Sequence, residues 1–414
     1  DYTVRFVPAL FGVFMVMSPL LLRRWLGRLG AVIASVLLLI SPSVLYYSRY
    51  IRNEIYIAVW MVLLAAALFH WLETRRPGWF YLGAAVLMLS LATKENAYFF
   101  GFAGLVFMIE VVLWERARRR ERAWLYLGGM VLCALLLFAS WWLGRLPAGG
   151  EDAAMAGILD FLHSLVAVVG GTLPAVLISA TLIRPRHPQP SRVVAALRSL
   201  SWRTWLLAIL VMFLIYILLF STFFTSPTGL ATGILGSLGY WLAQQEVERG
   251  GQPWYYYGLL LAMYEFVPLF FGLLGMGYYL LRPPARNPES DSPSPGADPG
   301  LHQEPTEPSF LQPQPSPALQ SLFVSFLIFW TLFSLFIYAW AGEKMPWMMV
   351  HQAVPLILLA ARFAGDLFGR VDWRAVWRRG GALLAFLLPV AVLALLALLQ
   401  PQDVAGWLAV LLLL

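Results

Sequence analysis

Apolar residues occur in long unbroken blocks that short polar segments separate. A helix needs about 20 apolar residues to cross the hydrocarbon core of a bilayer. Blocks of this length predict an all-α polytopic membrane protein with about 12–13 transmembrane helices. The predicted spans are residues 4–22, 29–47, 54–72, 79–93, 97–114, 123–143, 158–183, 203–224, 254–281, 319–340, 345–363 and 382–399, with a further one that starts near 404.

One segment interrupts this pattern. Residues 282–318 are rich in Pro, Ser and acidic side chains and contain few apolar ones, a composition typical of disorder. We therefore expect a transmembrane core at 1–281, a disordered cytoplasmic linker at 282–318 and C-terminal transmembrane helices at 319–414. The sequence starts at Asp1 and stops inside an apolar block, so we expect it to be a piece of a longer chain.

Composition excludes several classes of protein. Hydrophobic residues make up 60% of the 414 residues and charged residues 12%, which argues against a soluble enzyme, a nucleic-acid binder or a disulfide scaffold. The only cysteine excludes an internal disulfide bond. Unbroken rather than alternating apolar blocks disfavour an outer-membrane barrel.

Basic residues follow the alternation of the loops. If the loops are assigned alternately to two sides, 22 of the 29 lysines and arginines fall on one side, which is therefore predicted to be cytoplasmic. This distribution also explains the net charge of +7 without nucleic acid. Seven basic residues remain on the outer side, and the only two lysines, Lys94 and Lys344, are among them.

Two of the outer arginines lie close together in the segment 46–54. If the preceding helix continues, Arg49, Arg52 and Asn53 share one face, with Glu54 next to them. Guanidinium groups there suit a phosphate or pyrophosphate, which arginine binds bidentately. The alternative is interfacial snorkelling beside an aromatic belt.

Both lysines have a glutamate neighbour in a tight loop. Lys94 and Glu95 could form a surface ion pair of little energetic worth, or Lys94 could hold a lipid phosphate while Glu95 orients it. Glu343 lies near the start of the next helix, where a carboxylate is favoured, but this does not explain Lys344.

Three further features lie in or near the spans. His351 is roughly 8 Å along the helix from Pro346, where packing between helices and a site role are both open. Glu265 lies about 16 Å into its span, so it must be protonated, paired or in a wet cavity. The aromatic residues 254–257 suit either an interfacial belt or a surface for stacking sugars.

The sequence lacks the signatures of several activities. It contains no Walker-type loop, no HExxH zinc site, no GxSxG elbow and no strand-flanked GxGxxG. We therefore expect a substrate that arrives already activated on a lipid. The residues predict no cofactor and no metal site, and they leave open whether a divalent metal takes part.

Several motifs resemble one family. The chain is similar to prokaryotic "flippase activity-associated" membrane proteins, which are related to dolichyl-phosphate-mannose–protein mannosyltransferases and share the C-type glycosyltransferase fold. The resemblance covers nearly the whole chain outside the linker. The motifs are YYSRYIRNE at 46–54, TKE at 93–95, YW at 240–241, RGGQPWYYY at 249–257, YEF at 264–266 and, the most specific, AGEKMPW at 341–347 with His351 and Gln352.

The resemblance implies a polyprenyl-phosphate sugar donor and an external active site. The catalytic base in such enzymes is a carboxylate of the first external loop, and we expect it to precede Asp1. The predicted donor-phosphate ligands are Arg49, Arg52, Lys94 and Lys344. The residues predicted to bind sugar hydroxyls or to orient these cations are Asn53, Glu54, Glu95, Glu265, Glu343 and His351.

The sequence therefore predicts a multi-pass glycosyltransferase of the cell membrane that moves a sugar to a glycan or protein acceptor. The alternative is a flippase, or a flippase accessory, that handles polyprenyl-linked glycans without breaking bonds. A transporter is expected to contain internal repeats and broken helices, and no convincing repeat is present in the sequence.

Overall fold

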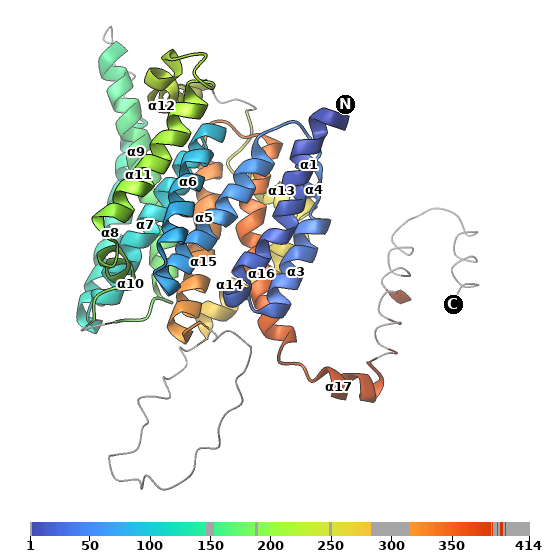
Figure 1. Ribbon diagram of the computed structural model, residues 1–414. Coiled ribbons are helices and arrows are strands. Elements are labelled where there is room, and N and C mark those ends of the chain that lie inside the picture. The colour runs from blue at the N-terminus through green and yellow to red at the C-terminus, as the bar shows by residue number, and fades with distance from the viewer. Residues whose placement is uncertain are drawn as a thin grey trace. The chain divides into compact units, whose positions relative to one another are not determined.

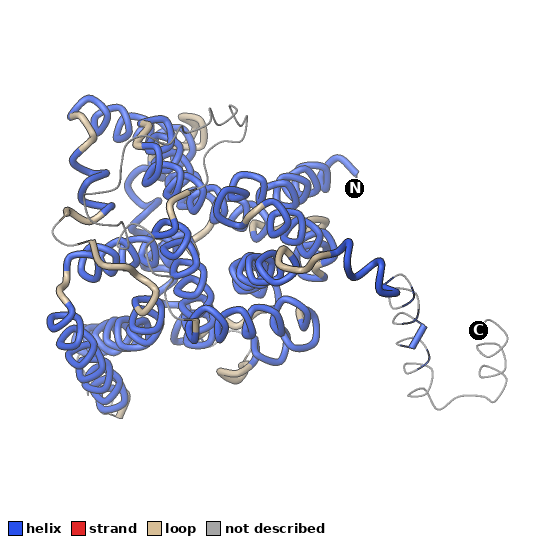
Figure 2. The backbone as a smooth tube through the Cα atoms, turned by 90° about the horizontal axis from the view of Figure 1, so that it is seen from below, coloured by secondary structure: helices blue, strands red, loops and turns tan. Residues whose placement is uncertain are grey.

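The protein is helical throughout its described parts. The computed structural model describes residues 2–145, 153–186, 189–247, 251–282 and 315–381, with scattered positions beyond (Figure 1). Figure 2 shows helices and loops in these ranges and no strand. The all-α fold class is therefore confirmed. The predicted linker lies almost entirely outside the described residues, and so do the last two predicted spans apart from single positions.

Most helices coincide with the apolar blocks. Eight in the described ranges are long and apolar enough to cross a membrane, or nine if one bent pair counts as a span. The elements are α1 (Tyr2–Met17), η1 (Ser18–Leu22), α2 (Arg23–Leu26), α3 (Arg28–Ile40), α4 (Pro42–Tyr47), α5 (Glu54–Thr74), α6 (Pro77–Thr93), α7 (Ala97–Arg116), α8 (Arg119–Leu143), α9 (Ala153–Ala180), α10 (Arg192–Arg198), α11 (Trp202–Phe220), α12 (Thr228–Val247), α13 (Tyr256–Tyr264), α14 (Phe266–Leu281), α15 (Pro317–Trp340), η3 (Pro346–Met348), α16 (Met349–Phe368), α17 (Trp373–Val376) and η4 (Trp377–Gly381).

Two predicted spans are interrupted. The block at 29–47 divides into α3 and α4 because Pro42 starts a new helix and the Ser41 hydroxyl caps it by accepting from the backbone N–H of Val44. The block at 254–281 divides at Glu265 into α13 and α14, which bend by 108°. The apolar pattern shows neither break, because the blocks stay apolar on both sides of each break.

The chain forms two compact units, Asp1–Gly365 and Asp366–Leu414. Inside the first unit, α15 and α16 are mostly buried, whereas α8 has no buried residue among its apolar side chains. This helix contacts α9, where Tyr126 donates from its hydroxyl to Leu177 O at 2.6 Å, and an apolar helix with so little burial fits a lipid-facing position. The predicted boundaries at 281 and 318 stay a prediction.

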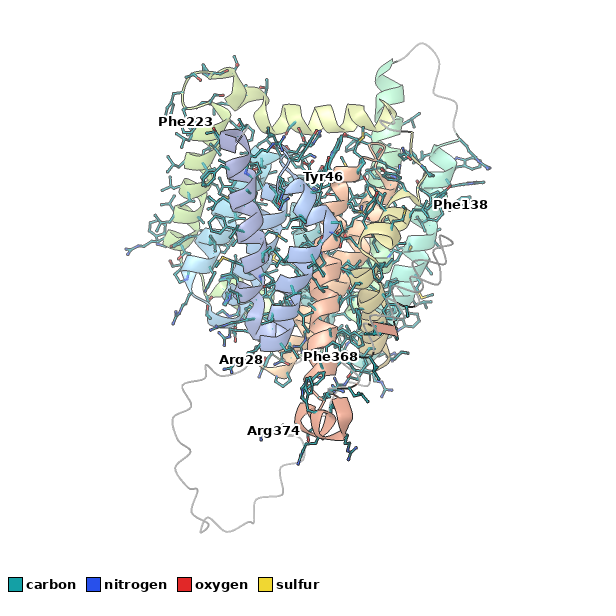
Figure 3. All side chains as sticks on the ribbon, turned by 90° about the vertical axis from the view of Figure 1, so that its right-hand side faces the viewer. Arg28, Tyr46, Phe138, Phe223, Phe368 and Arg374 are labelled. Atoms are coloured by element: carbon teal, nitrogen blue, oxygen red, sulfur yellow. The ribbon has the colours of Figure 1, made fainter. Side chains whose placement is uncertain are left out.

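The loops of the first unit gather at two opposite ends. Figure 3 places Tyr46 and Phe223 toward one end and Arg28 toward the other. We name them the Glu54 end, with loops 48–53, 94–96 and 341–347, and the Glu115 end, with loops 75–76 and 117–118 and the loop residues 184–186 and 189–191. Contacts within each group, described below, match the alternation that the charge count predicts. Which end faces the cytoplasm stays a prediction.

A close approach of α3 and α16 depends on two glycines. A Cβ atom at Gly365 would lie 2.8 Å from both Cα and N of Gly30. These are backbone atoms that cannot rotate away. Small residues allow such contacts between membrane helices.

We expect Gly365→Ala to lower the free energy of unfolding by about 1–3 kcal/mol, the usual cost of overpacking. Unfolding in mixed micelles measures the change. Gly128→Ala is the matched control, because an added Cβ there meets no atom within 4 Å. Equal stability of both variants would contradict the prediction.

Candidate functional site

A buried carboxylate holds two cations at the Glu54 end. Glu54 starts α5 and is 1% exposed. Lys94 donates from Nζ to Glu54 Oε1 at 2.5 Å, and Arg52 Nε lies 3.6 Å from Oε2. We call Arg52, Glu54, Lys94 and Trp347 the Glu54 cluster. A buried charge of this kind needs a paired partner, which explains why both cations turn toward Glu54.

The Glu54 cluster also includes the loop that precedes α16. The guanidinium carbon of Arg52 lies 3.6 Å from the ring centroid of Trp347, a cation–π contact. The most specific motif of the sequence, at 341–347, is thereby joined to the first arginine-containing motif. These two motifs are almost 300 residues apart in the chain, and tertiary packing brings them together.

Tyr257 fixes the same loop from another side. Its ring is 2% exposed, and its hydroxyl both donates to Met345 O and accepts from Met345 N, each at 3.0 Å. The neighbouring Lys344 is 9% exposed and donates from Nζ to Ala341 O at 2.8 Å. Lys344 thus lies in a restrained loop beside the cluster instead of extending into solvent.

The backbone next to Lys94 is positioned by side chains of α5 and its N-terminal loop. Asn53 donates from Nδ2 to Thr93 O at 3.0 Å, and Trp60 donates from Nε1 to Thr93 Oγ1 at 3.2 Å. These contacts fix the C-terminal end of α6. The backbone of Lys94 is thereby placed where its side chain can reach Glu54. Asn53 therefore acts on the site through the backbone in this structure.

Unpaired polar groups lie near the cluster in the protein interior. The ring of His351 stacks on Tyr338 with a centroid separation of 5.6 Å, and both His351 and Gln352 are fully buried. In the described part of the chain, neither ring nitrogen of His351 and neither amide atom of Gln352 has a hydrogen-bond partner. Burying a polar group without a hydrogen bond costs free energy of folding, so a polar ligand or water is expected to contact these groups.

The structure decides two points that the sequence left open for the cations. The helix does not continue through 48–53: α4 ends at Tyr47 and α5 starts at Glu54, so Arg49 and Arg52 do not share a helical face. Arg49 is exposed. The ionic partner of Lys94 is Glu54 rather than Glu95. Glu54 is buried, and a buried carboxylate is stable only when a positive charge compensates it. Glu95 and Glu343 are partly buried in the loops beside the two lysines.

Glu265 occupies a separate position at the break between α13 and α14. It is 2% exposed, and its Oε1 accepts from Ser41 Oγ at 2.5 Å, from Ser43 Oγ and from Ser43 N at 3.2 Å. The predicted alternatives were protonation, pairing or a wet cavity. The carboxyl group is hydrogen-bonded to the start of α4, and among the described residues it forms no ion pair with Arg52 or Lys94.

Sequence reasoning overlooked Ser41, Ser43 and Tyr338. A serine before proline is a helix-start signal, so Ser41 could have been recognised as a cap that divides the predicted span. Tyr338 carries a polar group within an apolar block, but nothing in the sequence indicates that its ring stacks on His351. Among the described residues, no three His, Cys, Asp or Glu side chains come together as metal ligands would.

Comparisons with known proteins agree with part of the sequence resemblance. Residues 1–143 match the family model described as dolichyl-phosphate-mannose-protein mannosyltransferase. No curated protein and no solved structure matches the chain. The matched segment contains Arg52, Glu54 and Lys94 but not the loop at 341–347. Through residues 1–143, this polytopic helical chain is related to the dolichyl-phosphate-mannose-protein mannosyltransferases.

Proposed function

We propose that this protein is a membrane glycosyltransferase that takes a sugar from a polyprenyl-phosphate donor at the Glu54 end. One observation carries the proposal: Arg52 and Lys94 converge on the buried Glu54, beside the restrained loop of Lys344. Arg52, Glu54 and Lys94 also lie in the segment related to the mannosyltransferases.

In the proposed reaction, an acceptor oxygen or nitrogen attacks the anomeric carbon while the bond from that carbon to the donor phosphate breaks. Negative charge then grows on the leaving phosphate. Arg52, Lys94 and Lys344 would stabilise this charge, and Arg49 would join them from its exposed position. Glu54 would act as a positioning residue that holds Arg52 and Lys94. The base that takes the acceptor's proton is not assigned to a described residue.

The sugar would lie next to the polar groups behind the cluster. His351 and Gln352 are buried without hydrogen-bond partners in the described part, which suits hydroxyl groups of a bound sugar. Glu95 and Glu343 would contact the sugar or orient the lysines, while Asn53 holds the backbone at Thr93. The proposed acceptor is a glycan or protein at the external face of the cell membrane, in line with the excess of arginine in the loops of the Glu115 end.

A carrier of polyprenyl-linked glycans is the second candidate. The observation in its favour is the bend of 108° at Glu265, since carriers contain broken helices near their substrate sites. Three hydrogen bonds to the start of α4 supply a structural explanation for the same bend. The substitutions below separate bond chemistry from transport.

We expect Arg52→Ala and Lys344→Ala each to reduce sugar transfer by about 10²–10³-fold, the usual cost of removing one charge-stabilising donor. The measurement uses labelled polyprenyl-phosphate sugar in proteoliposomes. Arg5→Ala is the control, because Arg5 is an exposed arginine of α1 that the chemistry does not use. Full activity of both test variants would refute the proposed site. Glycan translocation without any sugar transfer would favour the carrier.

A further inference from the structure

A second group of cations surrounds a carboxylate at the Glu115 end. Glu115 is fully buried, accepts from Arg192 N at 2.6 Å and forms an ion pair with the Arg192 guanidinium. Arg75 donates from Nη1 to Arg192 O at 3.0 Å, and Arg186 N donates to Glu115 O at 2.7 Å. We call Arg75, Glu115, Arg186 and Arg192 the Glu115 cluster. The C-terminal ends of α5 and α7, the segment after α9 and the start of α10 thus meet at one point.

The Glu115 cluster carries more positive than negative charge. It contains three arginines and one carboxylate, and the nearby Glu73 is already paired with Arg24 at 2.8 Å. The buried Nη1 of Arg186 has no hydrogen-bond partner in the described part of the chain. Orientation rules explain why arginines occur at this end, but they do not require three to converge.

The pKa of Arg75 agrees with an excess of positive charge in the Glu115 cluster. Burial, together with the positive charges of Arg186 and Arg192, lowers the pKa of the Arg75 guanidinium. A bound anion would relieve this repulsion and would supply an acceptor for Arg186. Arginine matches phosphate in particular, because its planar N–H groups bind two oxygens at once.

An apolar groove runs along the helices toward this cluster. It has a volume of about 320 Å³ and is lined by residues of α5, α6, α7, α11 and α15. On α5 the lining residues include Leu64, Leu68 and Trp71, and Arg75 follows Trp71 by four positions. Arg75 caps the C-terminal end of α5 in the left-handed conformation, one turn beyond Trp71, so the groove reaches the helix end at which Arg75 lies. Trp79, just beyond the turn on α6, lines the same end.

We infer that the groove and the Glu115 cluster together bind an anionic phospholipid, with its phosphate at Arg75, Arg186 and Arg192 and an acyl chain in the groove. An apolar groove that ends near a cluster with an excess of positive charge is complementary to a molecule with one anionic head and an apolar tail. Free phosphate matches the arginines alone and leaves the groove unused. The site lies at the opposite end from the proposed donor site and does not depend on the proposed function.

The test counts lipids retained by the full chain. Native mass spectrometry follows the protein after reconstitution with phosphatidylglycerol, with phosphatidylcholine as the neutral lipid. We expect tight retention of phosphatidylglycerol only, and about tenfold weaker retention in Arg186→Gln and Arg75→Gln, as expected from the loss of a charge-assisted contact. The matched control is Arg120→Gln, an exposed arginine of α8 at the same end, which should retain the lipid like the original chain.

A second variant tests the tail. Gly104 lines the groove, and an added Cβ there meets no atom within 4 Å, so Gly104→Leu fills the groove without a clash at its first atom. We expect it to weaken phosphatidylglycerol retention at least fivefold while unfolding at an unchanged temperature. Retention unaffected by Gly104→Leu, together with binding of inorganic phosphate, would identify a free-anion site and overturn the lipid proposal. Equal retention in Arg186→Gln, Arg75→Gln and Arg120→Gln would also overturn it.

Discussion

Lys94→Met should lower the free energy of unfolding by about 3 kcal/mol, at the lower end of the cost of breaking a buried ion pair. The substitution leaves the carboxylate of Glu54, which is 1% exposed, with only Arg52 at 3.6 Å. At 1% exposure the carboxylate gains little solvation in return. Unfolding in mixed micelles measures the loss, and Arg49→Met, in the exposed part of the same end, should change stability by less than about 0.5 kcal/mol.

The reverse substitution should cost less. Glu54→Gln leaves Lys94 and Arg52 without their anion, but their side chains are 15% and 35% exposed and can reach water. The double variant Glu54→Gln/Lys94→Met should therefore be more stable than Lys94→Met alone, with a coupling of about 1–3 kcal/mol. Additive effects would show that the pair does not form. Sugar transfer should stay low in the double variant, since the phosphate ligand is still missing.

Glu265→Leu should be the second strongly destabilising substitution, at about 3 kcal/mol. It removes the acceptor of two hydroxyl groups and one backbone N–H, and buried donors without acceptors cost about 1–3 kcal/mol each. Ser41 and Ser43 are buried at the start of α4, so their donors have no ready access to water once the carboxylate is gone. Thermal unfolding of the purified chain measures the effect.

Glu265→Gln separates structure from transport. The amide keeps an oxygen that accepts from Ser41 and Ser43, so we expect a loss of stability of about 1 kcal/mol and nearly unchanged sugar transfer. A carrier that uses the carboxyl group for coupling would lose its activity in this variant. Stability equal to that of Glu265→Leu would show that the serine contacts do not hold the break.

The candidate site was predicted in part. Arg52, Lys94 and Lys344 could be singled out because they conflict with the charge rule that the other loops obey, and their outer position stays a prediction. The geometry did not follow: the sequence left open whether a helix continues through 48–53, and whether Lys94 pairs with Glu95 or holds a phosphate. Sequence neighbours are the natural candidates for an ion pair, but burial of Glu54 makes it the stronger partner.

The sequence by itself determined that the chain is a bundle of membrane helices and which loops share an end, because apolar length and basic charge act locally along the chain. Tertiary structure alone decided that Glu54 holds the cations, that Trp347 covers Arg52, and that Arg75, Arg186 and Arg192 converge around Glu115. These contacts depend on which side chains lose access to water when distant helices pack. Hydropathy does not record that loss, since it assigns each residue one value whatever surrounds it.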